Sequence, residues 1–135
     1  MIRNRVEPVR LDVKIALAVH DRQLAEHGGG AGIREEALLE SALARPVNRW
    51  AYGEEEEDLA ALAAAYAFGI ARNHPFVDGN KRTAWVFGRL FLALNGVSLR
   101  FAAEDAIRIM LALAAGDVSE EALADWFRER VASRP

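Results

Sequence analysis

The segment from His74 to Thr83 places the most chemically capable side chains of this chain between two apolar stretches. It reads His-Pro-Phe-Val-Asp-Gly-Asn-Lys-Arg-Thr. Histidine titrates near neutral pH, so the side chain of His74 can accept a proton from a reacting group. Four residues later, Asp78 offers a carboxylate oxygen, which is a ligand type that suits Mg²⁺. Together these residues indicate a general base beside a metal ligand.

The second half of the segment has the features of a phosphate-binding helix start. Gly79 lets the backbone approach a ligand closely, and a new helical pattern begins at Asn80, Lys81 and Arg82. The first N–H groups of a helix have no partner within the helix, and the helix dipole is positive there, so this end favours anions. A base, a metal ligand and an anion site together predict phosphoryl or nucleotidyl transfer.

Ordinary turn chemistry is the alternative interpretation of the same residues. Pro-Phe and Asp-Gly pairs are common in connections between helices, and a single histidine at a helix end is more often a capping or packing residue. That interpretation accounts for each residue alone, but not for the whole set at fixed spacing, so the functional hypothesis is the stronger one.

The order of these residues resembles the signature of the Fic/Doc family, His-x-Phe-x-(Asp/Glu/Asn)-(Gly/Ala)-Asn-(Gly/Lys)-Arg. Fic AMP-transferases usually carry Gly between the Asn and the Arg, and a further Arg three residues later. Lys81 and Trp85 occupy these positions here, so the chain is similar to the Doc (death-on-curing) branch. That branch inverts the nucleotide and presents its γ-phosphate, so the resemblance implies a protein kinase.

The resemblance also implies a role for each residue of the segment. His74 would be the catalytic base, Asp78 would bind Mg²⁺, and Phe76 would anchor the motif in the core. The residues implied in binding the nucleotide and its phosphates are Arg72, Gly79, Asn80, Lys81 and Arg82. The cofactors would be ATP and Mg²⁺.

By the same resemblance, the chain would be the toxin of a toxin-antitoxin system. It would phosphorylate a threonine of elongation factor Tu and halt translation. A Phd-type antitoxin would fold a disordered segment into a groove of the toxin.

Three other functions stay open. A Fic-type AMP-transferase is the nearest, since most of the motif is shared, and Pro75 and Gly79 resemble that branch. A catalytically silent binding module would keep the fold without the chemistry. A metal-dependent hydrolase is the weakest alternative, because His74 and Asp78 alone cannot complete a transition-metal site.

Length and composition limit the remaining possibilities. The 135 residues fit a single domain covering 1–135, and the net charge of −3 argues against bulk nucleic-acid binding. No apolar run reaches the roughly 20 residues that span a bilayer, and cysteine is absent, so we expect a cytoplasmic protein without membrane contact.

Hydrophobic periodicity predicts an all-α protein, and the resemblance implies a Fic/Doc-type bundle of about six helices around a central buried helix, with a short flap loop. The expected helices are 11–27, 34–44, 58–72, 80–94, 103–115 and 119–131, with 80–94 at the centre. Pro46 should end the second helix, and the segment 45–57, with aromatic residues followed by the acidic run 54–57, should be the flap over the site.

Three smaller expectations concern the connections. Residues 1–10 should be an extended lead-in, and 97–101 an extended connector without a clear partner. The glycines after His27 should end the first helix and connect it to the second. His20 and His27 share a face of the first helix, where we expect solvent-facing or locally hydrogen-bonded histidines.

Overall fold

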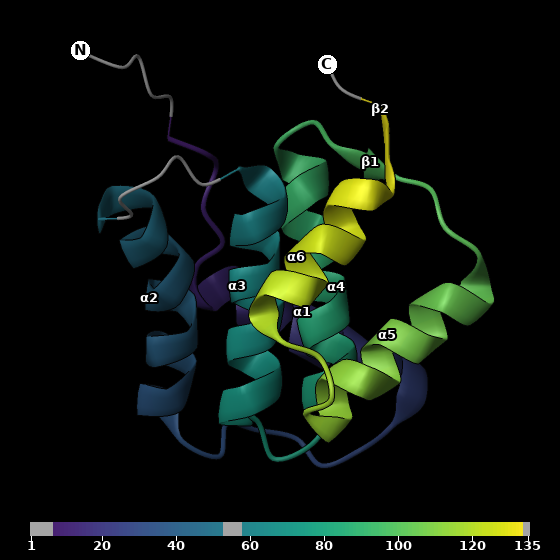
Figure 1. Ribbon diagram of the computed structural model, residues 1–135. Helices are drawn as coiled ribbons and strands as arrows, with labels where there is room; N and C mark the ends of the chain where they lie inside the picture. The colour runs from purple at the N-terminus through teal and green to yellow at the C-terminus, as the bar shows by residue number, and fades with distance from the viewer. Residues whose placement is uncertain (1–6, 53–57, 134–135) are drawn as a thin grey trace.

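A computed structural model describes residues 7–52 and 58–133 of the chain. Within these residues the fold is all-α, as predicted, with six helices and a small two-stranded sheet (Figure 1). The helices are α1 Val13–His27, α2 Glu36–Tyr52, α3 Leu59–Asn73, α4 Asn80–Leu94, α5 Ala103–Ala115 and α6 Glu120–Glu129. The strands are β1 Ser98–Leu99 and β2 Val131–Ser133. In the described residues no helix is long and apolar enough to cross a membrane.

The central helix is α3, and the expectation that 80–94 would hold this place is wrong. Eleven of the 15 residues of α3 are buried, and the helix packs against α2, α4 and α6 (Figure 1). Its alanines make it narrow on every side, so several neighbours can approach closely. α4 has the predicted bounds, but it turns Lys81, Arg82 and Arg89 to solvent.

Close helix crossings hold this arrangement together. Gly69 of α3 faces the backbone of Ala42 on α2, and a Cβ there would lie 3.2 Å from the Ala42 Cα. At Gly88 of α4 a Cβ would lie 3.2 Å from the Ala67 Cβ on α3. Glycine therefore sets the short distance from α3 to both of its main neighbours.

α2 continues past Pro46 to Tyr52, so the expectation that proline would end this helix is also wrong. A proline removes one backbone hydrogen bond, but packing of the surrounding helix can outweigh that loss. Pro46 is buried, where it lines a small apolar cavity together with Leu62 and Tyr66 of α3. On either side of Pro46, Arg45 and Arg49 reach the buried carboxylate of Glu120 on α6.

The first part of the expected flap is helix rather than loop. Residues 45–52 are helical, and 53–57, which include the acidic run, lie outside the described residues. Asp58 caps the opposite end of α3 from His74. The 15 residues of α3 separate Asp58 from His74 by about 22 Å at ~1.5 Å per residue, so Asp58 lies far from the motif.

The connector after α4 has a partner, contrary to expectation. Ser98 pairs with Ser133 and Leu99 with Val131 in an antiparallel arrangement, and the Arg100 N–H donates to the Arg130 carbonyl at 2.8 Å. The last helix accordingly ends at Glu129 and the chain turns into β2. Two short strands so far apart in the sequence leave no local signal of their pairing.

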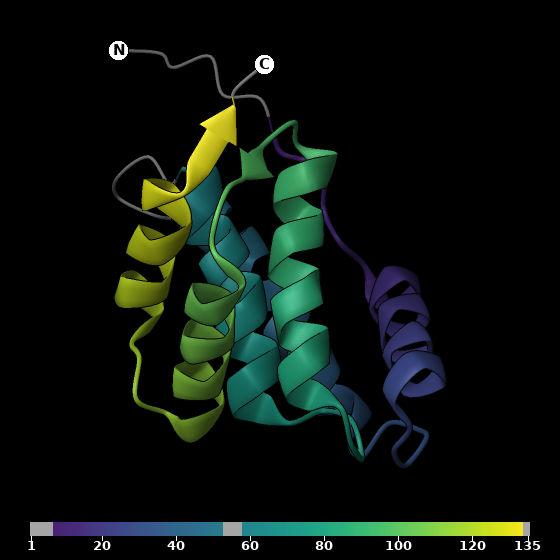
Figure 2. The same cartoon turned by 90° about the vertical axis from the view of Figure 1, so that its right-hand side faces the viewer.

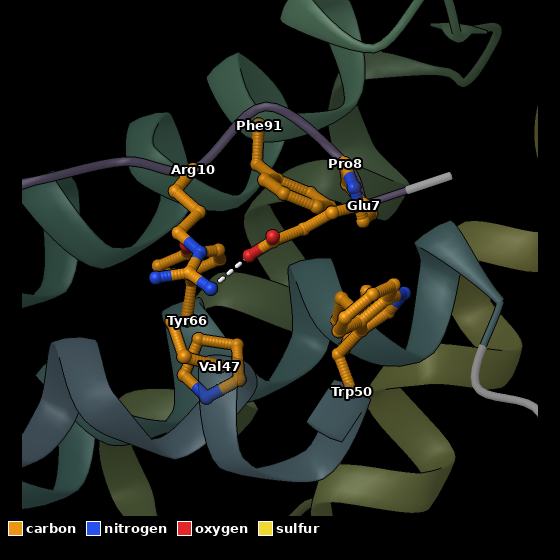
Figure 3. A pocket seen from close by; sticks show the side chains of 9 residues that line it. Glu7, Pro8, Arg10, Val47, Trp50, Tyr66 and Phe91 are labelled. Atoms are coloured by element: carbon orange, nitrogen blue, oxygen red, sulfur yellow. Dashed lines mark ion pairs between the residues drawn. The ribbon is translucent and has the colours of Figure 1, made fainter. Parts of the chain in front are cut away.

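Residues 7–12, which include the described part of the lead-in (7–10), cross α3 and α4 without forming a helix. The Leu11 N–H donates to the hydroxyl of Tyr66 at 3.1 Å, and the side-chain amide of Asn95 binds both the N–H and the carbonyl of Val9. Glu7 and Arg10 form an ion pair beside Tyr66 and Phe91 (Figure 3). The lead-in is thus fastened to the core.

Candidate active site

His74 ends α3 in a left-handed backbone conformation. Its φ of 50° makes it the one non-glycine residue with positive φ among the residues that the structure describes. Such a conformation costs energy in an L-residue and is often found at functional sites. Helix α3 ends here, just before Pro75, and the His74 side chain is exposed at the end of the bundle.

Arg34 fixes the end of α3 from outside. Its guanidinium donates to the carbonyl of His74 at 2.8 Å and to the carbonyl of Asn73 at 2.9 Å. The last carbonyls of a helix lack partners within the helix, so an arginine there both satisfies and orients them. The backbone that carries His74 is therefore held on both sides of its Cα.

Phe76 is buried and only 1% exposed, which supports the predicted role as an anchor. Asn80 closes the loop behind it: the Asn80 side chain accepts from the Phe76 N–H and donates to the Phe76 carbonyl, both at 3.0 Å. With its amide engaged in this way, Asn80 offers a phosphate mainly its backbone N–H. Its contribution to phosphate binding stays a prediction.

Asp78 and Gly79 stand at the start of α4. The Asp78 side chain is exposed, and its Oδ1 accepts the Gly79 N–H at 2.8 Å. Gly79 has a φ of 77° and provides no side-chain cap, and the first turn of α4 contains no acidic residue. The amino end of α4 therefore keeps its positive dipole uncompensated by protein carboxylates within the helix.

The donor set at Asp78 fits Mg²⁺. No group of three or more His, Cys, Asp or Glu side chains that could hold a metal occurs in residues 7–52 and 58–133. Mg²⁺ needs few protein ligands, because it takes the others from water and substrate phosphates, whereas a transition metal needs a fuller protein set. Asp78 beside the end of α4 would hold an ion that also contacts a polyphosphate.

Lys81 and Arg82 lie in the first turn of α4, and both are exposed. Neither forms an ion pair with another described residue. Both cations are thus available to an anionic ligand at the same helix end that offers free N–H groups.

Among the residues that the structure describes, the segment that lies against the motif loop is the connection from α1 to α2. Ile33 forms an isolated antiparallel bridge with Phe76, the Val77 N–H donates to the Gly32 carbonyl, and the Arg34 N–H donates to the Pro75 carbonyl. Both loops meet at one end of the bundle (Figure 2). Gly28 caps α1, as predicted, but the glycines that follow it also let the chain run along the motif. A helix cap needs one glycine, and the sequence has four between residues 28 and 32. The extra glycines were the feature of the sequence that could have indicated this second role.

Arg72 lies on the other side of α3 from α4, in a polar groove of about 770 Å³ between α2 and α3. Its guanidinium lies 5.2 Å from the ring centre of Phe68, and Arg45 and Arg49 line the same groove. The groove reaches Asn73, the residue before His74. Binding of nucleotide or substrate by Arg72 stays a prediction.

His20 is a residue of the site that the sequence interpretation missed. It is 2% exposed, its ring stacks on Phe76, and its Nε2 lies 2.7 Å from the Asp78 carbonyl oxygen. It is neither solvent-facing nor locally bonded, whereas His27 is exposed as expected. The partner of His20 is distant in sequence, so its position in α1 gave no sign of the contact.

Comparison with known proteins identifies the family of this chain. Residues 10–92 match the family described as the Fic/DOC family. The chain is 36% identical over 112 residues to a protein named "Protein kinase doc" from Escherichia phage P1, covering 83% of this chain and 87% of that protein. It is 47% identical over 73 residues to "Toxin Doc" of Mycolicibacterium smegmatis strain ATCC 700084 / mc(2)155, covering 53% of this chain and 55% of that one.

Proposed function

Since the chain belongs to the Fic/DOC family, we propose that it is a Doc-type toxin that transfers the γ-phosphate of ATP to a hydroxyl of a protein substrate. The observation that carries this proposal is the short loop that joins the exposed His74, at the end of α3, to Asp78 and the exposed Lys81 at the start of α4. The names of the two relatives, a protein kinase and a toxin, point in the same direction.

His74 acts as the general base. It takes the proton of a serine or threonine hydroxyl as that oxygen attacks the γ-phosphorus, and the bond from this phosphorus to the bridging oxygen breaks, releasing ADP. A positioned base of this kind contributes about 10²- to 10⁴-fold in rate. The exposed side chain and the fixed backbone of His74 suit this role, because the substrate is a large protein that must approach from solvent.

The amino end of α4 provides the electrostatic part of the reaction. Lys81, Arg82 and the N–H groups after Gly79 neutralise the polyphosphate, and such preorganised charge usually makes the largest contribution to phosphoryl transfer. Asp78 would hold Mg²⁺, which would supply positive charge to offset that of the phosphates. Lys81 stands where AMP-transferases usually have Gly, so it favours placing the γ-phosphate at the reacting position.

Residues 30–33 act as the flap, the segment that lies over the site and aligns the substrate. These residues run antiparallel to the motif loop through the Ile33 and Phe76 bridge and the Gly32 and Val77 hydrogen bond. Ala31 and Gly32 are exposed beside the loop that carries His74, so they could align an extended substrate segment.

The proposed target is a threonine of elongation factor Tu, and the proposed biological role is arrest of translation. The proposed partner is a Phd-type antitoxin that silences the toxin in a cytoplasmic complex. These proposals follow from the family resemblance and from the toxin name of one relative.

The test is the intact mass of purified elongation factor Tu after incubation with the protein, ATP and Mg²⁺. We expect a gain of one phosphate, and no gain with His74→Ala. A gain of one adenylate would assign the chain to the AMP-transferases, which Pro75 and Gly79 resemble. No gain would reject elongation factor Tu as the target.

Nucleotide binding separates an enzyme from a silent binding module. ATP with Mg²⁺ should raise the melting temperature of the wild-type protein, and Asp78→Ala should remove the part of that shift that depends on Mg²⁺. A Mg²⁺-dependent shift that persists in Asp78→Ala would remove Asp78 as the metal ligand.

A further inference from the structure

The contact between His20 and the motif loop joins two segments that are far apart in the sequence. The His20 ring stacks on Phe76 with 3.9 Å between ring centres and 7° between planes, and its Nε2 lies 2.7 Å from the Asp78 carbonyl oxygen. A carbonyl can only accept a hydrogen bond, so Nε2 carries the proton and donates it. At 2% exposure, water cannot replace this donor easily.

The direction of the Asp78 carbonyl matters because the peptide unit is planar. The carbonyl of Asp78 and the N–H of Gly79 belong to the same peptide group, so fixing one fixes the other. That Gly79 N–H donates to Oδ1 of Asp78 at 2.8 Å. His20 thus controls the orientation of the Asp78 carboxylate through one rigid peptide plane.

The surroundings leave this peptide few other orientations. A Cβ on Gly79 would lie 3.6 Å from the His20 Nε2, and a Cβ on Gly29 would lie 2.8 Å from Oδ2 of Asp78. α1 and the turn after it therefore enclose the Asp78 and Gly79 peptide on the side away from α3.

We propose that His20 is a positioning residue for the reaction: its Nε2–H holds the Asp78 and Gly79 peptide so that the carboxylate faces the metal and phosphate position at the amino end of α4. This inference rests on the proposed function of the motif. It assigns to α1 a part in the chemistry beyond packing. The stacking on Phe76 supports the loop, whereas the hydrogen bond sets its direction.

Two substitutions separate hydrogen bonding from packing. His20→Phe keeps an aromatic ring against Phe76 and removes the donor, and His20→Gln keeps a donor on a flexible side chain. His27→Phe, on the exposed end of the same helix, is the matched control. Each variant is measured for kcat, for the Mg²⁺ concentration that gives half-maximal activity, and for melting temperature.

We expect His20→Phe to lower kcat about 10- to 100-fold and to raise the Mg²⁺ requirement, since small misplacements of catalytic groups cost rates of this order. His20→Gln should recover part of both, and His27→Phe should behave as wild type. Wild-type kcat and Mg²⁺ requirement in a folded His20→Phe would overturn the proposal. If both His20 variants lost the same activity, in proportion to the fall in their melting temperatures, His20 would be a packing residue and the proposal would be wrong.

Amide hydrogen exchange at Gly79 tests the inference without any activity. The Gly79 N–H should exchange at least about tenfold faster in His20→Phe than in His20→Gln or wild type, because the peptide is no longer held. If elongation factor Tu gained no phosphate but this difference appeared, the target assignment would fail and the positioning role would stand. Unchanged exchange in His20→Phe would contradict that role.

Discussion

His74 combines an exposed side chain with a backbone held by Arg34, so its chemistry can be separated from the stability of the fold. His74→Ala should lower phosphoryl transfer by about 10²-fold or more, because the reaction loses its base. The melting temperature should change little, since the imidazole is exposed. A kinetic assay and thermal melting of the same preparation measure the loss of activity and the change in stability. Full activity in the folded variant would remove His74 as the base.

The side chain of Asn80, unlike that of His74, stabilises the fold, because it forms two hydrogen bonds with the backbone of the motif loop. Asn80→Ala leaves the N–H and carbonyl of Phe76 without their side-chain partner, so we expect a loss of about 1–3 kcal/mol in unfolding free energy together with activity. Asn80→Asp, which keeps the acceptor and loses the donor, should lose less. Urea unfolding gives the comparison. Unchanged stability in Asn80→Ala would show that these bonds are replaced by water.

At the residue scale, the motif was predictable because it is local. His74, Asp78, Lys81 and Arg82 are close in sequence, and their types indicate their chemistry without any fold. His20 could not be found in this way, since its importance comes from a contact with a carbonyl 58 positions away. A sequence shows side-chain chemistry directly, but it shows backbone partners only after the chain has folded.

At the scale of elements, the turn after α1 forms one wall of the site. Gly28→Ala and Gly29→Ala both place a side chain at positive φ, but a Cβ at Gly28 meets nothing within 4 Å. At Gly29 it would lie 2.8 Å from Oδ2 of Asp78. We therefore expect similar losses of stability, and a loss of Mg²⁺-dependent activity in Gly29→Ala alone. Titration of activity with Mg²⁺ measures this difference; equal Mg²⁺ dependence would place Asp78 away from the turn.

Helix bounds were predictable where a local signal coincided with the packing. α4 and α5 have the predicted ends, and Ser119, the predicted start of the last helix, is the N-cap of α6. The predicted end of α2 was wrong because Pro46 is a strong local signal for the end of a helix. Here the packing of α2 on α3 and the contacts of Arg45 and Arg49 with Glu120 outweigh that signal. Residues 45–52, which were expected in the flap loop, therefore belong to α2.

At the scale of the whole molecule, residues 7–12 join the start of the chain to the core through Tyr66. Burial raises the pKa of the Tyr66 hydroxyl above its usual value of 10.0, and Leu11 donates to the same oxygen. Above pH 10 the unfolded chain therefore loses this proton first, so the native state binds more protons and stability falls as pH rises. Below pH 10 this contribution is fully present.

Tyr66→Phe should remove this pH dependence and leave the Leu11 N–H without its partner. We expect the variant to be less stable at neutral pH by about 1–3 kcal/mol, with a difference from wild type that shrinks above pH 10. Urea midpoints at neutral and alkaline pH supply the comparison. A difference that stays constant with pH would mean that Tyr66 does not titrate differently on folding.

We propose that the amino end of α4, with Lys81 in its first turn, directs the γ-phosphate of ATP to a protein hydroxyl. The most direct measurement uses ATP labelled at either the γ- or the α-phosphorus, added with the wild-type protein or His74→Ala to a bacterial translation extract. We predict His74-dependent label on a protein from the γ-labelled nucleotide and none from the α-labelled one. Label from the α-phosphorus would contradict the claim and make the chain an AMP-transferase despite Lys81.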